Sequence, residues 1–308
     1  MSSGGSDVER PGRAGVIGGA LVAASSLLFG IVVILGRITA DSGLPVAAVL
    51  AVRFAGCALL LAAVLVATRR PLVAVEGERA GAVFAGVGGY AVEASFFFAA
   101  LRHGNAAPVT LLFYTYPVFV TLASWPLGRG APSAPTIVAL ALGIGGAGLV
   151  VAGSGQLAIA TLGVILALCS AVTYTGYILA ADRVLRRTQP LTSSLWVSGA
   201  ACVGLAAFAL VTGSLALPTR AADWLAILGM SVATAAAFVC LFAGLQRLGA
   251  VRTAIISSTE PLAAALLAVA FLGESVGLSV AIGGVLIVAG AVVASIGVGA
   301  APPEPPIP

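Results

Sequence analysis

Three charged residues lie inside long apolar runs of the sequence: Arg53, Glu93 and Glu260. A charge in such a run is costly, so it usually faces a water-filled cavity or a partner charge and often serves binding or ion movement. Arg53 follows Pro45 by eight residues and Glu93 precedes Leu101 by eight, which puts both about 12 Å below the same end of their helices at 1.5 Å per residue. We expect an Arg53–Glu93 ion pair that either locks two helices, binds a zwitterion or forms part of a gate.

Proline residues mark two breaks in these runs. Glu260 lies near the middle of its run and is followed by Pro261, and Pro117 interrupts an earlier run. Proline removes a backbone hydrogen bond and kinks a helix, so Pro117 and Pro261 are candidate hinges. A carboxylate beside such a kink could bind a substrate amine, or load and release a proton; alternatively it is protonated and hydrogen-bonded to a neighbouring helix. Arg53, Glu93 and Glu260 are the candidate coupling or gating residues.

Aromatic and hydroxyl side chains recur at helical spacing near these charges. Tyr90, for example, shares a helix face with Glu93. The candidate substrate-binding residues are Tyr90, Glu93, Tyr114, Tyr116, Tyr174, Tyr177, Trp196, Ser257 and Glu260. Tyr114 and Tyr116 cannot both point into one cavity, because helix positions two apart do not share a face. The alternative is that these side chains only join helices through hydrogen bonds, and Trp196 could equally pack or face lipid.

The elements that carry these residues are expected to be membrane helices. The chain has 308 residues, of which 60% are hydrophobic and 8% charged, and its mean hydropathy is +1.14; a water-soluble domain cannot cover that much apolar surface. Runs of about 20 apolar residues can span a bilayer. Ten windows qualify: 14–36, 46–68, 80–101, 106–125, 136–153, 161–181, 192–213, 222–245, 250–272 and 276–297. They are apolar all round, unlike barrel strands, so we predict an all-α integral membrane protein with ten transmembrane helices.

Other classes of function find little support. The basic residues are scattered singly, which excludes a nucleic-acid patch despite the net charge of +4. The four cysteines, at positions 57, 169, 202 and 240, have no metal-ligand spacing, and His103 is the only histidine. We therefore expect no metal and no cofactor. The sequence contains no H-E-x-x-H, so an intramembrane enzyme is the least favoured alternative.

The loops predict an orientation. Most arginines, including Arg69, Arg186 and Arg187, fall on the same side as the N-terminus if ten helices are present. Positively charged loops remain in the cytoplasm, so we expect both termini to be cytoplasmic in a bacterial-type inner (plasma) membrane. Residues 1–13 form a cytoplasmic tail, and the proline-rich residues 298–308 should be disordered.

The sequence also repeats itself. The stretch LRHGNAAPVTLLFYTYPVF aligns with LQRLGAVRTAIISSTEPLA, so that Pro117 falls on Pro261, and Cys57 matches Cys202 in a register one residue different. The chain is thus two five-helix halves, 14–153 and 161–297. Because five is odd, the second half enters the membrane from the opposite side and the repeat is inverted. Such halves can exchange conformations and alternate the access to a site between them, which predicts a secondary transporter.

With LGR following TYP in one half and LGE following STEP in the other, the chain resembles the EamA family of the drug/metabolite transporter superfamily. The resemblance covers nearly the whole chain, but Arg129 stands where the second half has Glu274. It implies export or uptake of amino acids, other metabolites or drugs without ATP, and helices 5 and 10 as packing or homodimer elements.

We expect an exporter of a small metabolite, with the lipid bilayer as its surroundings and protons as a candidate coupling ion. The alternative outside transport is a membrane scaffold or sensor that binds a ligand without moving it.

Overall fold

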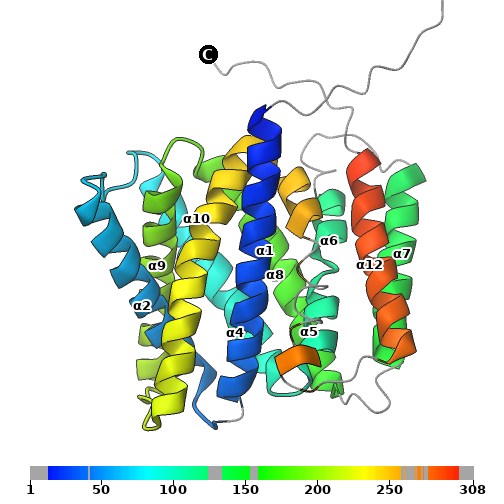
Figure 1. Cartoon of the computed structure of the whole chain (residues 1–308), viewed down its shortest axis with the longest axis horizontal. Coiled ribbons are helices and arrows are strands. Elements are labelled where there is room, and N and C mark those ends of the chain that lie inside the picture. Colours follow the sequence, from blue (N-terminus) through cyan, green and yellow to red (C-terminus); the bar gives the residue numbers. More distant parts are fainter. Residues whose placement is uncertain are drawn as a thin grey trace, which may run out of the picture.

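The computed structural model describes residues 13–40, 42–123, 134–152, 159–257, 260, 267, 269–271, 273 and 277–297. Within these ranges the chain consists of helices and short connections, and no strand occurs (Figure 1). The tails predicted at 1–13 (apart from Arg13) and 298–308, together with Arg129, Pro261 and Glu274, lie outside the described residues.

The helices follow the apolar runs of the sequence closely. Their bounds are α1 Arg13–Ala40, α2 Val46–Ala67, α3 Arg79–Phe84, the π-helix η1 Ala85–Tyr90, α4 Ala91–Leu101, α5 Ala106–Phe113, α6 Tyr116–Ala123, α7 Ala134–Ala152, α8 Thr161–Val184, α9 Pro190–Val211, α10 Ala221–Ser257 and α12 Leu278–Gly297. Among the described residues, six helical segments are long and apolar enough to cross a membrane, and three shorter apolar helices accompany them. The all-helical membrane architecture is as expected, and the count of ten transmembrane helices remains a prediction.

Three of the described helical runs are interrupted, and each interruption coincides with a glycine or a proline. In the run from Arg79, the π-helix η1 follows α3, and a Cβ at Gly86 would lie only 2.5 Å from the carbonyl oxygen of Val197. The next run breaks between α5 and α6, just before Pro117, which has no N–H for the carbonyl four residues back. The two helices within α10 meet at Gly249, whose φ of +75° suits glycine.

The helices pack as long antiparallel or crossing pairs. α1 lies along α10, α2 along α9, α4 against α8, and α7 against α12 (Figure 1). Glycine allows the closest approach: a Cβ at Gly244 would collide with Val22 of α1, as expected where small residues let membrane helices approach. The first three of these pairs surround a buried aromatic cluster that contains the candidate site.

Candidate functional site

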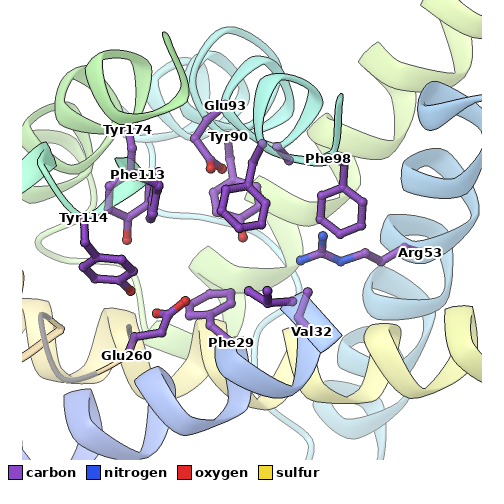
Figure 2. Close-up of a pocket in the computed structure, with 13 residues that line it drawn as sticks. Phe29, Val32, Arg53, Tyr90, Glu93, Phe98, Phe113, Tyr114, Tyr174 and Glu260 are labelled. Atoms are coloured by element: carbon purple, nitrogen blue, oxygen red, sulfur yellow. The ribbon is translucent and has the colours of Figure 1, made fainter. Parts of the chain in front are cut away.

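A pocket lies between α1, α2, α4, α5, α8 and Glu260 (Figure 2). Its cavity volume is about 40 Å³, within about 450 Å³ of unfilled space that includes the part open to solvent. The residues that line it are Phe29, Val32, Val33, Arg53, Tyr90, Glu93, Ala94, Phe97, Phe98, Phe113, Tyr114, Tyr174 and Glu260. The structure thus brings the three charged residues of the apolar runs to one place, each reaching the pocket from a different side (Figure 2).

Arg53 reaches the pocket from the first half of α2 and is 1% exposed. Its Nε donates a hydrogen bond to Thr234 Oγ1 of α10, at 2.9 Å. The guanidinium carbon lies 4.9 Å from the ring centroid of Phe54 and 5.2 Å from that of Phe98, distances at which aromatic faces attract a cation. The Tyr90 hydroxyl is also within hydrogen-bonding reach. A neutral hydroxyl and two aromatic rings therefore surround this buried charge.

Glu93 occupies the α4 side of the pocket, where its Oε1 accepts a hydrogen bond of 2.9 Å from Ser170 of α8. Glu93 and Arg53 are near enough to interact electrostatically, but they are not among the ion pairs within 4.0 Å in the described part of the chain. The direct ion pair predicted from their equal depth is therefore wrong. Depth does not fix how a helix is rotated, and each side chain turns to a hydroxyl on another helix, Ser170 or Thr234.

Glu260 is buried on the opposite side of the pocket and is 7% exposed. The hydroxyl of Tyr114 points toward it and is within hydrogen-bonding reach (Figure 2). Tyr114 is the first residue after α5, so the helix break before Pro117 places this phenol beside the carboxyl group. The pair joins the first half of the sequence to the second at the pocket.

The remaining tyrosines form a layer in and behind the pocket wall. Tyr90 and Tyr174 line the pocket, whereas Tyr116 and Tyr177 are buried behind them. The ring centroids of Tyr116 and Tyr174 are 4.7 Å apart, and those of Tyr90 and Tyr177 are 5.3 Å apart. Tyr114 lines the pocket and Tyr116 does not, in keeping with their spacing. Ser257 lies outside the lining, within hydrogen-bonding reach of the Tyr116 hydroxyl.

Trp196 does not belong to the pocket. Its indole N–H donates a hydrogen bond of 2.9 Å to the carbonyl oxygen of Leu72, in the connection between α2 and α3. The amphipathic indole thus fastens a loop at the end of the bundle, a role that composition alone does not distinguish from ligand binding. Sequence reasoning also missed Thr234 as the partner of Arg53. A single hydroxyl in an apolar run is too common a feature to single out.

Comparison with known proteins agrees with this architecture. Residues 16–152 and 161–296 each match the model of the EamA-like transporter family. The chain belongs to this family. It is 28% identical over 199 residues to an uncharacterized transporter from Archaeoglobus fulgidus, covering 64% of this chain and 70% of that protein. It is 31% identical over 175 residues to an uncharacterized transporter from Synechocystis sp., covering 53% and 51%.

A solved crystal structure supports the fold of this EamA-like transporter. It superposes with a TM-score of 0.66 at 21% sequence identity, covering 93% of this chain and 98% of the other. At this identity the likeness concerns the fold alone. Family membership and the apolar helices together identify a multi-pass membrane protein with a transport role, and they confirm the resemblance seen in the sequence.

A second polar feature of the transporter lies at the end of the bundle where α1 begins (Figure 1). Glu78, just before α3, accepts hydrogen bonds from the backbone N–H groups of Arg187 and Thr188, both at 2.9 Å, and from the Thr188 hydroxyl at 2.6 Å. Gln246 of α10 donates to the carbonyl oxygens of Leu185 and Thr188. We call the set Glu78, Arg187, Thr188 and Gln246 the latch. It ties the α2–α3 connection to the α8–α9 connection and to α10.

The electrostatics of the latch favour an ionised Glu78. Burial raises the pKa of this carboxyl, but the hydrogen bonds from Thr188 and Arg187, together with the Arg187 charge, outweigh burial and leave the pKa below its ordinary value. Arg187 Nε lies 3.7 Å from Glu78 Oε1. Because the Arg187 side chain is 70% exposed, the ion pair itself adds little, and the hydrogen bonds dominate.

Proposed function

We propose that this EamA-like transporter is a secondary transporter that exports a small metabolite through alternating access, and that the pocket is its substrate site. The observation that carries the proposal is the convergence of Arg53, Glu93 and Glu260 in one aromatic-walled pocket inside an apolar bundle. Buried charges of both signs, each held by a neutral hydroxyl, are costly to keep without a polar ligand to bind. A small polar molecule, such as an amino acid or a related compound, carries groups that complement these charges in sign.

The pairing of helices supports an inverted repeat of residues 14–153 and 161–297. In that repeat α8 corresponds to α1, and the first part of α10 corresponds to α3 and α4. The contact between α1 and α10 then corresponds to the contact between α8 and α4, while α2 with α9 and α7 with α12 are pairs of equivalent helices. Exchange of the two halves' conformations would leave this set of pairs unchanged, as alternating access requires.

The position of the pocket suggests which way it opens. Arg53 is the eighth residue of α2, and Phe98 lies in the last turn of α4, so the pocket is nearer the end opposite the latch. With the termini in the cytoplasm of a bacterial-type inner membrane, as the arginine distribution predicts, this conformation faces outward. The latch then ties the cytoplasmic end together, beside a second cavity of about 390 Å³ lined in part by Leu185, Phe242 and Gln246.

Glu260 is the residue we propose for proton coupling, since it is a buried carboxyl group in the pocket and bonds a neutral phenol. Pro117 and Pro261 are the hinges we propose for the exchange between conformations. The homodimer implied by the resemblance, with α7 and α12 in the interface, remains a prediction that cysteine cross-linking along these helices would test.

The function can be tested by untargeted metabolite profiling of the medium. Cells that express the transporter would be compared with cells that express Glu260→Gln at equal membrane levels. We expect at least one small metabolite to accumulate outside with the wild type and not with the variant, because loss of the ionisable group stops coupled flux. Identical media would count against export, and full flux with unchanged pH dependence in the variant would end the coupling role.

A further inference from the structure

We propose that the transported molecule carries a carboxylate group that docks on Arg53, and that Thr234 is the residue that positions Arg53 for it. The inference deepens the proposed function and rests on it, since it assigns a chemical class to the ligand of the same pocket. Its basis is the incomplete set of partners around a buried guanidinium.

Arg53 is the only cation among the described residues that line the pocket. A guanidinium has five N–H donors in a planar fork, and here Nε uses Thr234 while the Tyr90 hydroxyl is within reach of another. In the described part of the chain no carboxylate lies within 4.0 Å of it. A cation that is 1% exposed normally has an anionic partner, because desolvation is otherwise too costly. The rings of Phe54 and Phe98 offset part of that cost, and a ligand anion would supply the rest.

The remaining chemistry of the pocket selects a carboxylate among anions. Arg53 faces the two carboxyl groups of Glu93 and Glu260 across the same space. A doubly charged phosphate would meet one cation and two acids, whereas a single carboxylate matches the guanidinium fork with two parallel hydrogen bonds. Seven of the lining residues besides the charges are aromatic, namely Phe29, Tyr90, Phe97, Phe98, Phe113, Tyr114 and Tyr174. They suit an apolar or aromatic body attached to the carboxylate.

Thr234 fixes the direction of the guanidinium from α10. It is 0% exposed, and its hydroxyl accepts from Arg53 Nε. One turn earlier, the Ser231 hydroxyl donates to the Arg53 carbonyl oxygen at 2.9 Å, and a Cβ at Gly56 would lie 2.6 Å from that hydroxyl. α10 therefore holds both the backbone and the side chain of Arg53. With Nε bonded to Thr234, the far edge of the guanidinium points into the pocket (Figure 2).

The test is a binding measurement on the purified full-length transporter in nanodiscs, by calorimetry, with acids and their matched amides as probes. The pairs are phenylalanine with phenylalaninamide, leucine with leucinamide, and benzoate with benzamide; inorganic phosphate is the further anion. We expect at least one acid to bind, its amide to bind at least tenfold more weakly, and phosphate not to compete. Arg53→Gln should abolish the preference for acid over amide.

Thr234 has its own matched variants. Thr234→Val keeps the shape and removes the acceptor, so the acid should bind about tenfold more weakly while the affinity for the amide stays the same. Thr234→Ser keeps the hydroxyl and should restore acid binding. If Thr234 had a purely structural role, Thr234→Val would weaken the binding of acid and amide alike, or Thr234→Val and Thr234→Ser would bind the acid with equal affinity. Either result overturns the positioning role.

The carboxylate inference is overturned if no acid in the panel binds, if acid and amide bind equally, or if Arg53→Gln retains the preference. These results are separate from a failure of transport. A wild type that exports a metabolite but binds no acid refutes the anion site alone. A wild type that binds an acid through Arg53 but changes no medium or vesicle content refutes the transport proposal alone.

Discussion

Replacing Glu78 with glutamine should release the latch and favour opening of the end of the bundle that it closes. The carboxylate accepts three hydrogen bonds from Arg187 and Thr188. The amide of glutamine has one acceptor oxygen, and its NH₂ group must face at least one of the N–H donors. The change is small in volume, so the helices on either side should remain intact.

The size of the effect follows from the bonds lost. A hydrogen bond to a charged acceptor contributes about 1.5–3 kcal/mol, so losing one or two of the three costs about 3 kcal/mol. The exposed Arg187 side chain adds little to this figure. At about 1.4 kcal/mol for each factor of ten, local opening should become roughly a hundredfold more frequent.

Hydrogen exchange measured by mass spectrometry reads this opening directly, because the amides of Arg187 and Thr188 are the donors of the latch. Their exchange in Glu78→Gln should be roughly a hundredfold faster than in the wild type, within the limit set by full exposure. Glu76→Gln is the matched control: Glu76 lies in the same connection but is exposed, and its replacement should leave exchange unchanged. Equal protection in wild type and Glu78→Gln would refute the latch.

The pH dependence gives an independent check with a definite sign. The pKa of Glu78 is lower in the folded protein than its ordinary value. Its contribution to stability is therefore fully present above the ordinary glutamate pKa of about 4.3 and is lost only as the pH falls through the lowered pKa. Between about pH 5.5 and 8 the protection of these amides, corrected for intrinsic exchange, should be constant. Any change of flux in that range must come from another group.

Four substitutions, one of them a control, test the packing and the limits of the pocket. Gly86→Ala should lower the unfolding temperature, because the new Cβ would lie 2.5 Å from a carbonyl oxygen of α9. The expected loss of folding stability is about 1–3 kcal/mol. Gly176→Ala is the control and should leave the unfolding temperature unchanged, since a Cβ at Gly176 would have no atom within 4 Å. Equal melting of the two variants would contradict this packing. Tyr114→Phe removes the hydroxyl beside Glu260 and should reduce flux about tenfold, and wild-type flux would exclude that contact. Trp196→Phe should retain flux, since Trp196 lies outside the pocket. A large loss of flux would mean that Trp196 contributes to the substrate site.

The helices could be predicted from the sequence because their signals are local. The window 46–68 became Val46–Ala67, and 192–213 became Pro190–Val211, since an apolar run of about 20 residues with a proline at its start specifies its own ends. The π-helix at Ala85–Tyr90 could not be predicted in this way. It occurs where Gly86 packs against the backbone of α9, and that contact depends on a helix more than a hundred residues away.

The candidate site shows the same division between local and distant information. Helical spacing predicted that Tyr90 and Glu93 share a face, and both line the pocket. The partner of Arg53 could not be read from spacing, because Thr234 is 181 residues away and is reached only through the rotation of α10 against α2. The surroundings of Trp196 could not be predicted for a related reason: its partner is a loop carbonyl, which carries no side-chain signal in the sequence.

The inverted repeat makes one last prediction, because the latch has a counterpart at the other end of the bundle. In the register of the two matched cysteines, Glu78 corresponds to Asp223, and Arg187 and Thr188 correspond to Ser42 and Gly43. Asp223 is buried in the first turn of α10. In the described part of the chain its carboxylate makes none of the bonds that Glu78 makes. Among the described residues one end is latched and the other is not, as expected if two equivalent halves are held in different conformations.

If the halves exchange conformations, Asp223 should bind the connection between α1 and α2 when the latch is open. Glu78→Gln, which favours that state, should therefore slow amide exchange at Ser42 and Gly43 while it speeds exchange at the latch. Adding Asp223→Asn should remove the new protection and leave the latch as open as before. Unchanged exchange at Ser42 and Gly43 in Glu78→Gln would mean that the two ends are not coupled, and the argument from symmetry to alternating access would fail with it.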